Sequence, residues 1–480
     1  MIRPAIPAFL QNEVLHAPRF KQALVAGILL LSIFAGLQAS LELAWLVGLG
    51  VAVMIGSIVL MRRLDWGIFL LVPLSMSIRF VLGTGTAVPL NLTIMLSGGL
   101  IALWILRMLV LEREVRFFPS RTTTPALLFA LATTVSLFAG NIRWVILASE
   151  GASLAAQLGA WALYVFPMGI FLLVGNRIHD VSQLRQLTCL FLGWASSYIV
   201  VRLFELNFIR DAVFVSVRSL GSVFWIFLVA MAAGQCLYNH DLKLRWRIAM
   251  GVLVLATLFV NIRQSFGWFS GWMPPLGALL TVMWFKSPRW RYVLITMIFI
   301  GGLINFSTLY AWVQEQFQQH TVFSRQATYP IMFELIKANP ILGLGPANYY
   351  HYTPLYPILG WYVKFNSHSN YVDIIAQTGL LGLGIFIWLV VEIVRVAFRL
   401  LSVVQDGFSR AYIHGALGGL AAMLVSGFLG DWFLPFVYNV GFSGFRASVF
   451  AWIFLGGLLV IERVHASQKA AQPVEESSKG

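Results

Sequence analysis

Long apolar runs dominate this chain, and each run of roughly 17–25 residues can cross the hydrocarbon core of a bilayer as an α-helix. The composition agrees, because 59% of the 480 residues are hydrophobic and 11% are charged, whereas soluble domains carry about 25% charged residues. This composition excludes a soluble enzyme and a secreted module. The runs are continuous rather than alternating, which argues against an outer-membrane barrel. The expected fold class is all-α, a polytopic transmembrane helical bundle.

About fourteen spans are expected, in a range of 12–14. The apolar runs lie near residues 22–37, 41–61, 66–83, 91–111, 124–141, 155–175, 187–205, 217–237, 246–262, 266–285, 291–308, 371–398, 411–429 and 445–461. Most connections are short, and a single long one divides the chain. The predicted organisation is therefore helices 1–11 in residues 1–308, a long, partly helical outer loop in 309–370, helices 12–14 in 371–461 and a tail in 462–480. No cleavable signal peptide is evident.

The basic residues predict the orientation. With the N-terminus in the cytoplasm, 23 of the 33 Lys and Arg residues fall on the inner side and 10 on the outer side. Since cytoplasmic loops carry the excess of positive charge, both termini are expected in the cytoplasm and the long loop outside. The net charge of +14 then reflects this bias, and no nucleic-acid partner is expected.

Eight of the ten outer cations are arginine. A single outer arginine is explained by contact with lipid head groups. As a set, however, they also suggest a lining for an anionic ligand, because guanidinium binds phosphate with two parallel hydrogen bonds. The candidates are Arg79, Arg202, Arg210, Arg218, Arg263 and Arg325.

The long loop is rich in tyrosine, with eight of the chain's 14 tyrosines between Tyr310 and Tyr371. They are consistent either with an aromatic belt at the membrane surface or with a sugar-binding surface. The possible substrate-lining residues are Tyr349, Tyr350, Asn370 and Tyr371, together with Asp431, which could orient or pair an arginine.

Within this loop, residues 323–340 predict an amphipathic helix lying in the bilayer interface. Ser324 is its expected cap, and Asn339–Pro340 its end. His368 stands about six residues before the next apolar run, within roughly 10 Å of the membrane surface if that helix extends back to Ser367.

Three segments resemble the O-antigen ligase and O-antigen polymerase superfamily, chiefly its C-terminal signature of an arginine, a glycine turn, a histidine and a Thr-Gly-Leu-Leu-Gly sequence. They are YPIMFELIKANPILGLGPANYY (329–350), SHSNYVDIIAQTGLLGLGIF (367–386) and NIRQSFGWFSGW (261–272). In the last segment Ile262 and Gln264 depart from the family's usual Ser-Arg-Gly. The resemblance covers roughly residues 245–460.

The resemblance implies glycosyl transfer from a polyprenyl-pyrophosphate-linked glycan to a sugar hydroxyl outside the bacterial cytoplasmic (inner) membrane. His368 matches the family's essential histidine, and Arg263 and Arg325 match its two essential arginines. The chemistry suits these residues, since histidine serves as a base near neutral pH and two arginines stabilise a departing pyrophosphate. The chain contains no Asp-x-Asp pair, so a metal-independent, inverting transferase without metal or other cofactor is expected.

Several alternatives remain open. A ligase would use lipid A–core as acceptor, whereas a polymerase would use another lipid-linked repeat; the related protein-O-oligosaccharyltransferases carry a larger outer domain than this one. A transporter of a small anion or inorganic carbon would belong to a different class. It would show paired broken helices or inverted repeats and acidic residues deep in its spans, of which Glu392 is the main candidate. The sequence predicts no broken helices.

Overall fold

The computed structural model describes residues 56–471 with short gaps. The gaps are 58, 84–88, 143, 146–149, 216, 266–267, 305–306, 308–309, 312–319 and 359, and side chains are also undescribed at 217–220, 264–265, 294, 297–299, 301–302, 304, 320–326 and 471. The first predicted span, 22–37, and most of the second, 41–61, lie outside the described residues. The described part is almost entirely helical, which confirms an all-α membrane protein.

Eight helices of the described part are long and apolar enough to cross a membrane. They are α5 (Leu92–Leu106) with the π-helical turn η2 (Arg107–Glu112), α7 (Leu154–Arg177), α8 (Val181–Leu203), α10 (Val217–Tyr238), α11 (Leu244–Ser265), α17 (Asn370–Val403), α18 (Phe408–Leu429) and α19 (Gly441–Ala471). The fourteen-span count stays a prediction.

The remaining elements are shorter. They are α4 (Leu64–Ser77), α6 (Thr123–Ala139), α9 (Asn207–Val213), α12 (Phe269–Trp284), α13 (Pro288–Ile304), α15 (His320–Ile336), α16 (Tyr349–Tyr352), the 3-10 turn η3 (Thr353–Leu355) and a small antiparallel pair, β1 (Val81–Leu82) and β2 (Leu90–Asn91).

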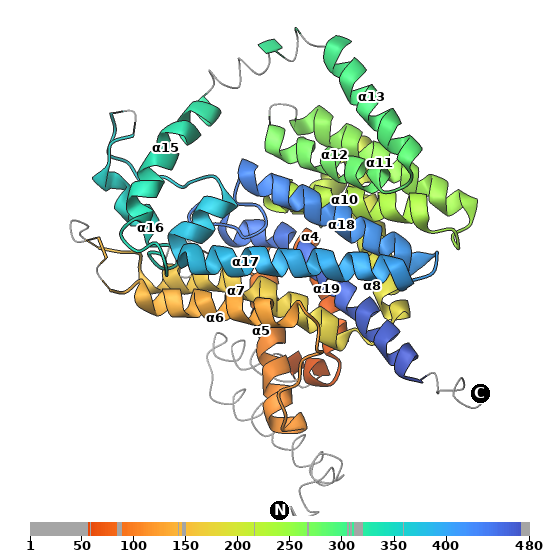
Figure 1. Cartoon of the computed structure of the whole chain (residues 1–480), viewed down its shortest axis with the longest axis horizontal. Helices are drawn as coiled ribbons and strands as arrows, with labels where there is room; N and C mark the ends of the chain where they lie inside the picture. Colours follow the sequence, from red (N-terminus) through yellow and green to blue (C-terminus); the bar gives the residue numbers. More distant parts are fainter. Residues whose placement is uncertain are drawn as a thin grey trace, which may run out of the picture. The chain divides into compact units, whose positions relative to one another are not determined.

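The apolar helices pack into layers whose centre is formed by α10 and α19 (Figure 1). These two helices are buried on nearly all sides, as expected for helices that are apolar all round. α10 packs against α18, α12 and α11, while α19 packs against α7. α17, α6 and α7 lie side by side, and they support the segment that carries the candidate site.

The predicted loop helix is present, but it begins earlier than expected. α15 starts at His320, so Ser324 lies inside the helix and is not its cap. The helix ends at Ile336, and Asn339 then accepts a hydrogen bond from the backbone N–H of Leu342 (3.3 Å). The end near Asn339–Pro340 therefore agrees with the prediction to within a few residues.

Two predicted continuous helices are interrupted at glycines with left-handed backbone angles. One is Gly221 near the start of α10 (φ 48°), and the other is Gly379, ten residues into α17 (φ 68°). Interrupted helices were not expected from the sequence. The reason is that glycine tolerates a positive φ without steric cost, so a glycine inside an apolar run can carry a break that hydropathy alone does not reveal.

The interruption in α17 is filled by a strap formed by residues 340–345. The N–H groups of Leu380 and Leu381 donate to the carbonyls of Pro340 (2.8 Å) and Ile341 (3.2 Å). In return, the helix carbonyls of Ala376 and Gln377 accept from the N–H groups of Leu344 (2.8 Å) and Gly345 (3.2 Å). Backbone groups freed at membrane depth must find protein partners, and here the strap supplies all four.

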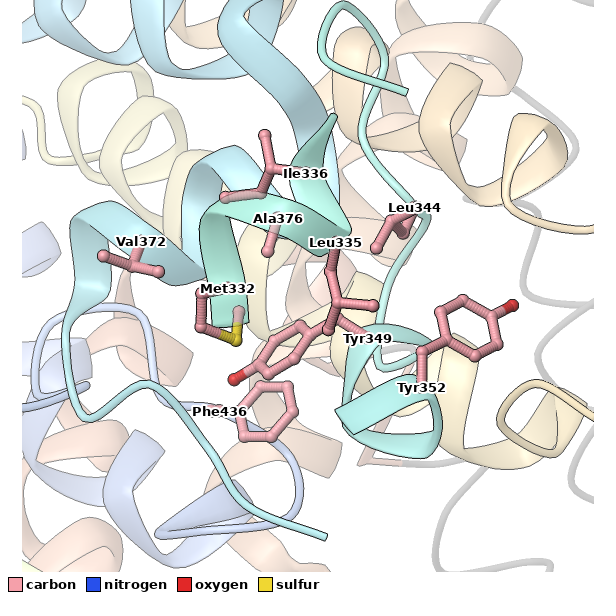
Figure 2. Close-up of a cluster of buried hydrophobic side chains, with 9 residues drawn as sticks. All are labelled: Met332, Leu335, Ile336, Leu344, Tyr349, Tyr352, Val372, Ala376 and Phe436. Atoms are coloured by element: carbon pink, nitrogen blue, oxygen red, sulfur yellow. The ribbon is translucent and has the colours of Figure 1, made fainter. Parts of the chain in front are cut away.

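A buried apolar cluster holds the outer elements together (Figure 2). Its members come from α15, the strap, α16, α17 and the segment that joins α18 to α19. They are Met332, Leu335, Ile336, Leu344, Tyr349, Tyr352, Val372, Ala376 and Phe436. The cluster fixes α16 against the first turns of α17, directly beside His368.

Candidate functional site

His368 lies in a turn just before α17 and is the exposed residue among buried neighbours. The neighbours on both sides are buried, namely Asn366, Ser367, Ser369 and Asn370. Ser367 and Asn370 are completely buried. The backbone of His368 has φ +51°, a left-handed conformation that is uncommon outside glycine and asparagine. The turn therefore presents the imidazole outward while the residues on either side anchor it.

The anchor is the carboxylate of Asp373, in the first turn of α17. Its Oδ1 accepts hydrogen bonds from the Ser367 hydroxyl (2.7 Å) and the Tyr349 hydroxyl (2.6 Å). The Ser367 oxygen in turn accepts from the N–H of Ser369 (3.1 Å), so the bonds close around His368. Asp373 is completely buried, so its hydrogen bonds to the two hydroxyls are shielded from water.

Asn370 and Tyr371 tie the same turn to neighbouring segments, and Tyr371 is partly exposed. The Asn370 amide donates to the carbonyl of Leu434 (2.6 Å) and accepts from the N–H of Phe433 (3.1 Å). The Tyr371 hydroxyl donates to the carbonyl of Leu424 (2.7 Å). Asn370 is completely buried, so its predicted place in a substrate lining is wrong.

The loop tyrosines divide into structural and exposed groups. Tyr349 is fully buried, with its ring stacked on Phe436 at 4.8 Å, so it cannot lie against a sugar as predicted. Tyr350 is partly buried and stacks on Tyr438 at 4.6 Å. Tyr362, in contrast, is 68% exposed. Burial raises the pKa of Tyr349 well above its usual range, and the nearby Asp373 reinforces the shift, so this hydroxyl remains a donor.

Asp431 does not pair with an arginine among the described residues. Its carboxylate accepts from the N–H of Phe436 (2.8 Å) and from the Asn439 side chain (2.6 Å). It thereby closes the turn between α18 and α19. Burial raises the pKa of this carboxyl above its usual range, and the expected role of orienting an arginine is replaced by that of a turn cap.

Four of the predicted arginines surround the segment between α8 and α10. Arg263, in the last turn of α11, forms an ion pair with Glu205 (3.2 Å), and both side chains are more than half exposed. Arg79 donates to the carbonyl of Phe214 (2.6 Å), and Arg210 bonds its neighbour Asp211 (2.7 Å). The hydrogen bond from Arg210, together with the charges of Arg79 and Arg202, lowers the pKa of Asp211.

Arg218 and Arg325 lie in α10 and α15, and their side chains are outside the described residues. Arg79, Arg202 and Arg210 thus surround Asp211, and Arg263 pairs with Glu205; an anionic site here stays a prediction. No contact between this arginine group and His368 is described. Trp268, five residues after Arg263, has a ring contact with Trp432 (5.3 Å), next to the Phe433–Leu434 backbone that holds Asn370.

Sequence reasoning missed the anchoring groups, Ser367 and Asp373. A carboxylate in the first turn of a helix, six residues after a serine, was the available signal. Within the part of the chain that the structure describes, no cluster of three or more His, Cys, Asp or Glu side chains could hold a metal ion.

Comparison with known protein families gives a match. Residues 248–387 match the O-antigen ligase family, and this stretch contains Arg263, the strap, α16, the His368 turn and the interruption in α17. No curated protein matches the chain. The match supports the resemblance carried by the motifs: residues 248–387, less than half of the chain, are similar to the O-antigen ligase family.

Proposed function

We propose that the protein is a membrane glycosyltransferase that moves a glycan from a polyprenyl-pyrophosphate donor to a sugar hydroxyl on the outer side of the bacterial cytoplasmic membrane. The observation that carries the proposal is the His368 turn. An exposed imidazole stands on a strained, fully anchored backbone inside a domain that matches the O-antigen ligase family. Strained residues held by their surroundings are concentrated at functional sites.

In this mechanism His368 accepts the proton of the acceptor hydroxyl as its oxygen attacks the anomeric carbon. The new C–O bond forms while the bond to the pyrophosphate oxygen breaks, and the lipid pyrophosphate leaves with the electron pair. Arg263 and Arg325 stabilise the charge that develops on it. Attack from the face opposite the leaving group inverts the configuration, and the two arginines take the place of a metal ion.

A transporter is the second candidate, and the interrupted helices α10 and α17 are the observation that favours it. Transporters use unwound backbone carbonyls to coordinate ions. In α17, however, the carbonyls of Ala376 and Gln377 already accept from the strap. Glu392, the acidic residue expected for ion coupling, is bonded to Arg395 in the same helix (2.6 Å). Both observations support the enzyme over the transporter.

The acceptor class is tested by the surface glycan of a deletion strain. A ligase is the first choice, so we expect lipid A–core without attached chains and an accumulation of lipid-linked polymer. Single attached repeats without long chains would identify a polymerase of the same superfamily. Unchanged surface glycan in the deletion strain would contradict the proposed function altogether.

A further inference from the structure

A cavity of about 860 Å³, lined by polar and apolar groups, lies beside α16. Its walls are the end of α6, the segment leading into α7, the α16–η3 segment and Lys364. The volume is within the range of about 300–1,000 Å³ that small-molecule sites occupy. None of the residues predicted from the sequence as catalytic or substrate-lining belongs to it.

The described walls carry side-chain amides and apolar groups. The Asn141 amide donates to the Gln157 side-chain oxygen (3.2 Å) and to the carbonyl of Leu137 (2.8 Å), and the Gln157 amide donates to the carbonyl of Ala152 (2.8 Å). Apolar patches are supplied by Ile142 and Leu355. The lone pairs that remain on the two amide oxygens, next to apolar patches, suit a ligand with hydroxyl groups and C–H faces.

Among the described residues of the lining the charges balance, which argues against a pyrophosphate. The charged side chains there are Lys364 and Glu150. A pyrophosphate site needs a surplus of positive charge, as the arginine group around α9 provides. The cavity therefore favours a neutral glycan over the charged part of the same donor.

A series of hydrogen bonds holds the Lys364 ammonium group in place. Lys364 donates to Nδ1 of His351 (3.2 Å), so Nε2–H of His351 donates to the Tyr438 hydroxyl (3.1 Å). Burial, together with the charge of Lys364, lowers the pKa of His351, which keeps the imidazole neutral and able to accept from the lysine. An ammonium group has three N–H donors, so two remain for hydroxyls of a ligand.

The cavity and the His368 turn share one support. Asn348 lines the cavity, and its amide bonds the carbonyl of Gly140 (2.9 Å) and the N–H of Ala152 (2.9 Å). The next residue, Tyr349, bonds Asp373 beneath His368. A glycan that fills the cavity would thus lie against the same short helix that helps to anchor the candidate base.

We infer that this cavity binds neutral sugar units of the glycan substrate, at a distance from the reacting carbon. The inference rests on the proposed function, because it assigns to that enzyme a subsite for the sugars that do not react. Such a subsite would select substrates by their glycan rather than by their lipid.

Binding of a lipid-free glycan tests the inference. The probe is the oligosaccharide released by mild acid from the strain's own lipid-linked glycan, titrated by calorimetry into the purified full-length protein. Lys364→Met and Asn141→Leu, at exposed positions, should each weaken binding about tenfold, as for one lost hydrogen bond of the stronger kind. Lys337→Met, at an outer lysine paired with Glu334, is the matched control and should bind as the wild type does.

Equal affinity of the wild type and both cavity variants, or no binding to the wild type, would overturn the inference. The melting temperature of each variant shows that a loss of affinity is not a loss of fold. Because binding is measured without transfer, the two proposals fail separately. Glycan binding without transfer activity would refute the proposed function alone, and transfer without cavity-dependent binding would refute this inference alone.

Discussion

At the scale of single residues, the proposed catalysis depends on how the His368 imidazole is held. The left-handed turn is costly for a histidine, and it persists because Ser367, Ser369 and Asn370 are each bonded to buried groups. A base must lie within hydrogen-bond reach of the proton that it accepts. The residues beneath the turn should therefore affect turnover more than substrate binding.

Removing the Ser367 hydroxyl should lower kcat about tenfold with KM unchanged, because a buried acceptor that loses its hydrogen-bond partner costs about 1–3 kcal/mol. Asp373→Ala should cost more than Asp373→Asn, since asparagine keeps an oxygen that accepts from both hydroxyls. Ser426→Ala is the control, because this buried serine donates to the carbonyl of Met423 in its own helix (2.7 Å). Steady-state kinetics that leave Ser367→Ala at wild-type kcat would show that the turn needs no such anchor.

Arg263 and Arg325 should stabilise the pyrophosphate through the geometry of their hydrogen bonds as well as through their charge. Arg263→Lys and Arg325→Lys keep the charge but lose the two-pronged hydrogen bond, so each should lower kcat/KM by about 30–150-fold, or about 2–3 kcal/mol. Glu205→Gln breaks only an exposed ion pair, which is worth about 0–1 kcal/mol, and should change the rate less than about fivefold. Lysine variants with wild-type kinetics would show that another group stabilises the charge on the departing pyrophosphate.

At the scale of elements, the interruption of α17 is the feature that builds the site. The strap and the broken helix exchange four backbone hydrogen bonds, which positions α16 and the turn before α17 together. Gly343 and Gly379 make this approach possible. A Cβ at Gly379 would lie 2.0 Å from the carbonyl oxygen of Ile341, and one at Gly343 would lie 2.5 Å from the backbone of Gln377.

Gly379→Ala should therefore destabilise the protein strongly. The left-handed conformation alone costs a non-glycine residue about 1–2 kcal/mol, and the overlap with Ile341 adds to this. Gly384→Ala, in the same helix with no atom within 4 Å of its Cβ, should melt at the wild-type temperature. The melting temperatures of both variants in detergent test this prediction. Equal melting temperatures would show that the strap does not pack against α17 as described.

The sequence predicts the elements of this region better than their contacts. Hydropathy finds the helices, and the proline and glycines after Asn339 predict the turn between α15 and α16. The break at Gly379 is not predictable in this way, because its left-handed conformation is imposed by a strap nearly forty residues earlier. Tyr349 and Tyr362 look alike in a tyrosine-rich loop, yet one is buried and the other exposed, because the partner of Tyr349 is Phe436 in a distant segment.

At the scale of the whole molecule, the proposed transfer reaction requires the His368 turn to lie on the outer side of the membrane. The charge distribution predicts this orientation, and labelling can check it. In a background without Cys189 and Cys236, a membrane-impermeant maleimide should label Tyr362→Cys in intact spheroplasts, because this side chain is exposed. Arg245→Cys, at an exposed position in the first turn of α11, should react only after permeabilisation. The reverse pattern would place the site in the cytoplasm.

Transfer by the purified protein tests the central claim most directly. Full-length protein in proteoliposomes, given lipid-linked glycan and acceptor, should form the glycosidic product in the presence of EDTA and lose activity as the pH falls and His368 is protonated. His368→Ala should be slower by about 10²–10⁴-fold, the range for a lost general base, whereas His240→Ala, at an exposed histidine between α10 and α11, should retain wild-type turnover. Near-normal turnover of His368→Ala, or activity abolished by EDTA and restored by Mg²⁺, would contradict the account.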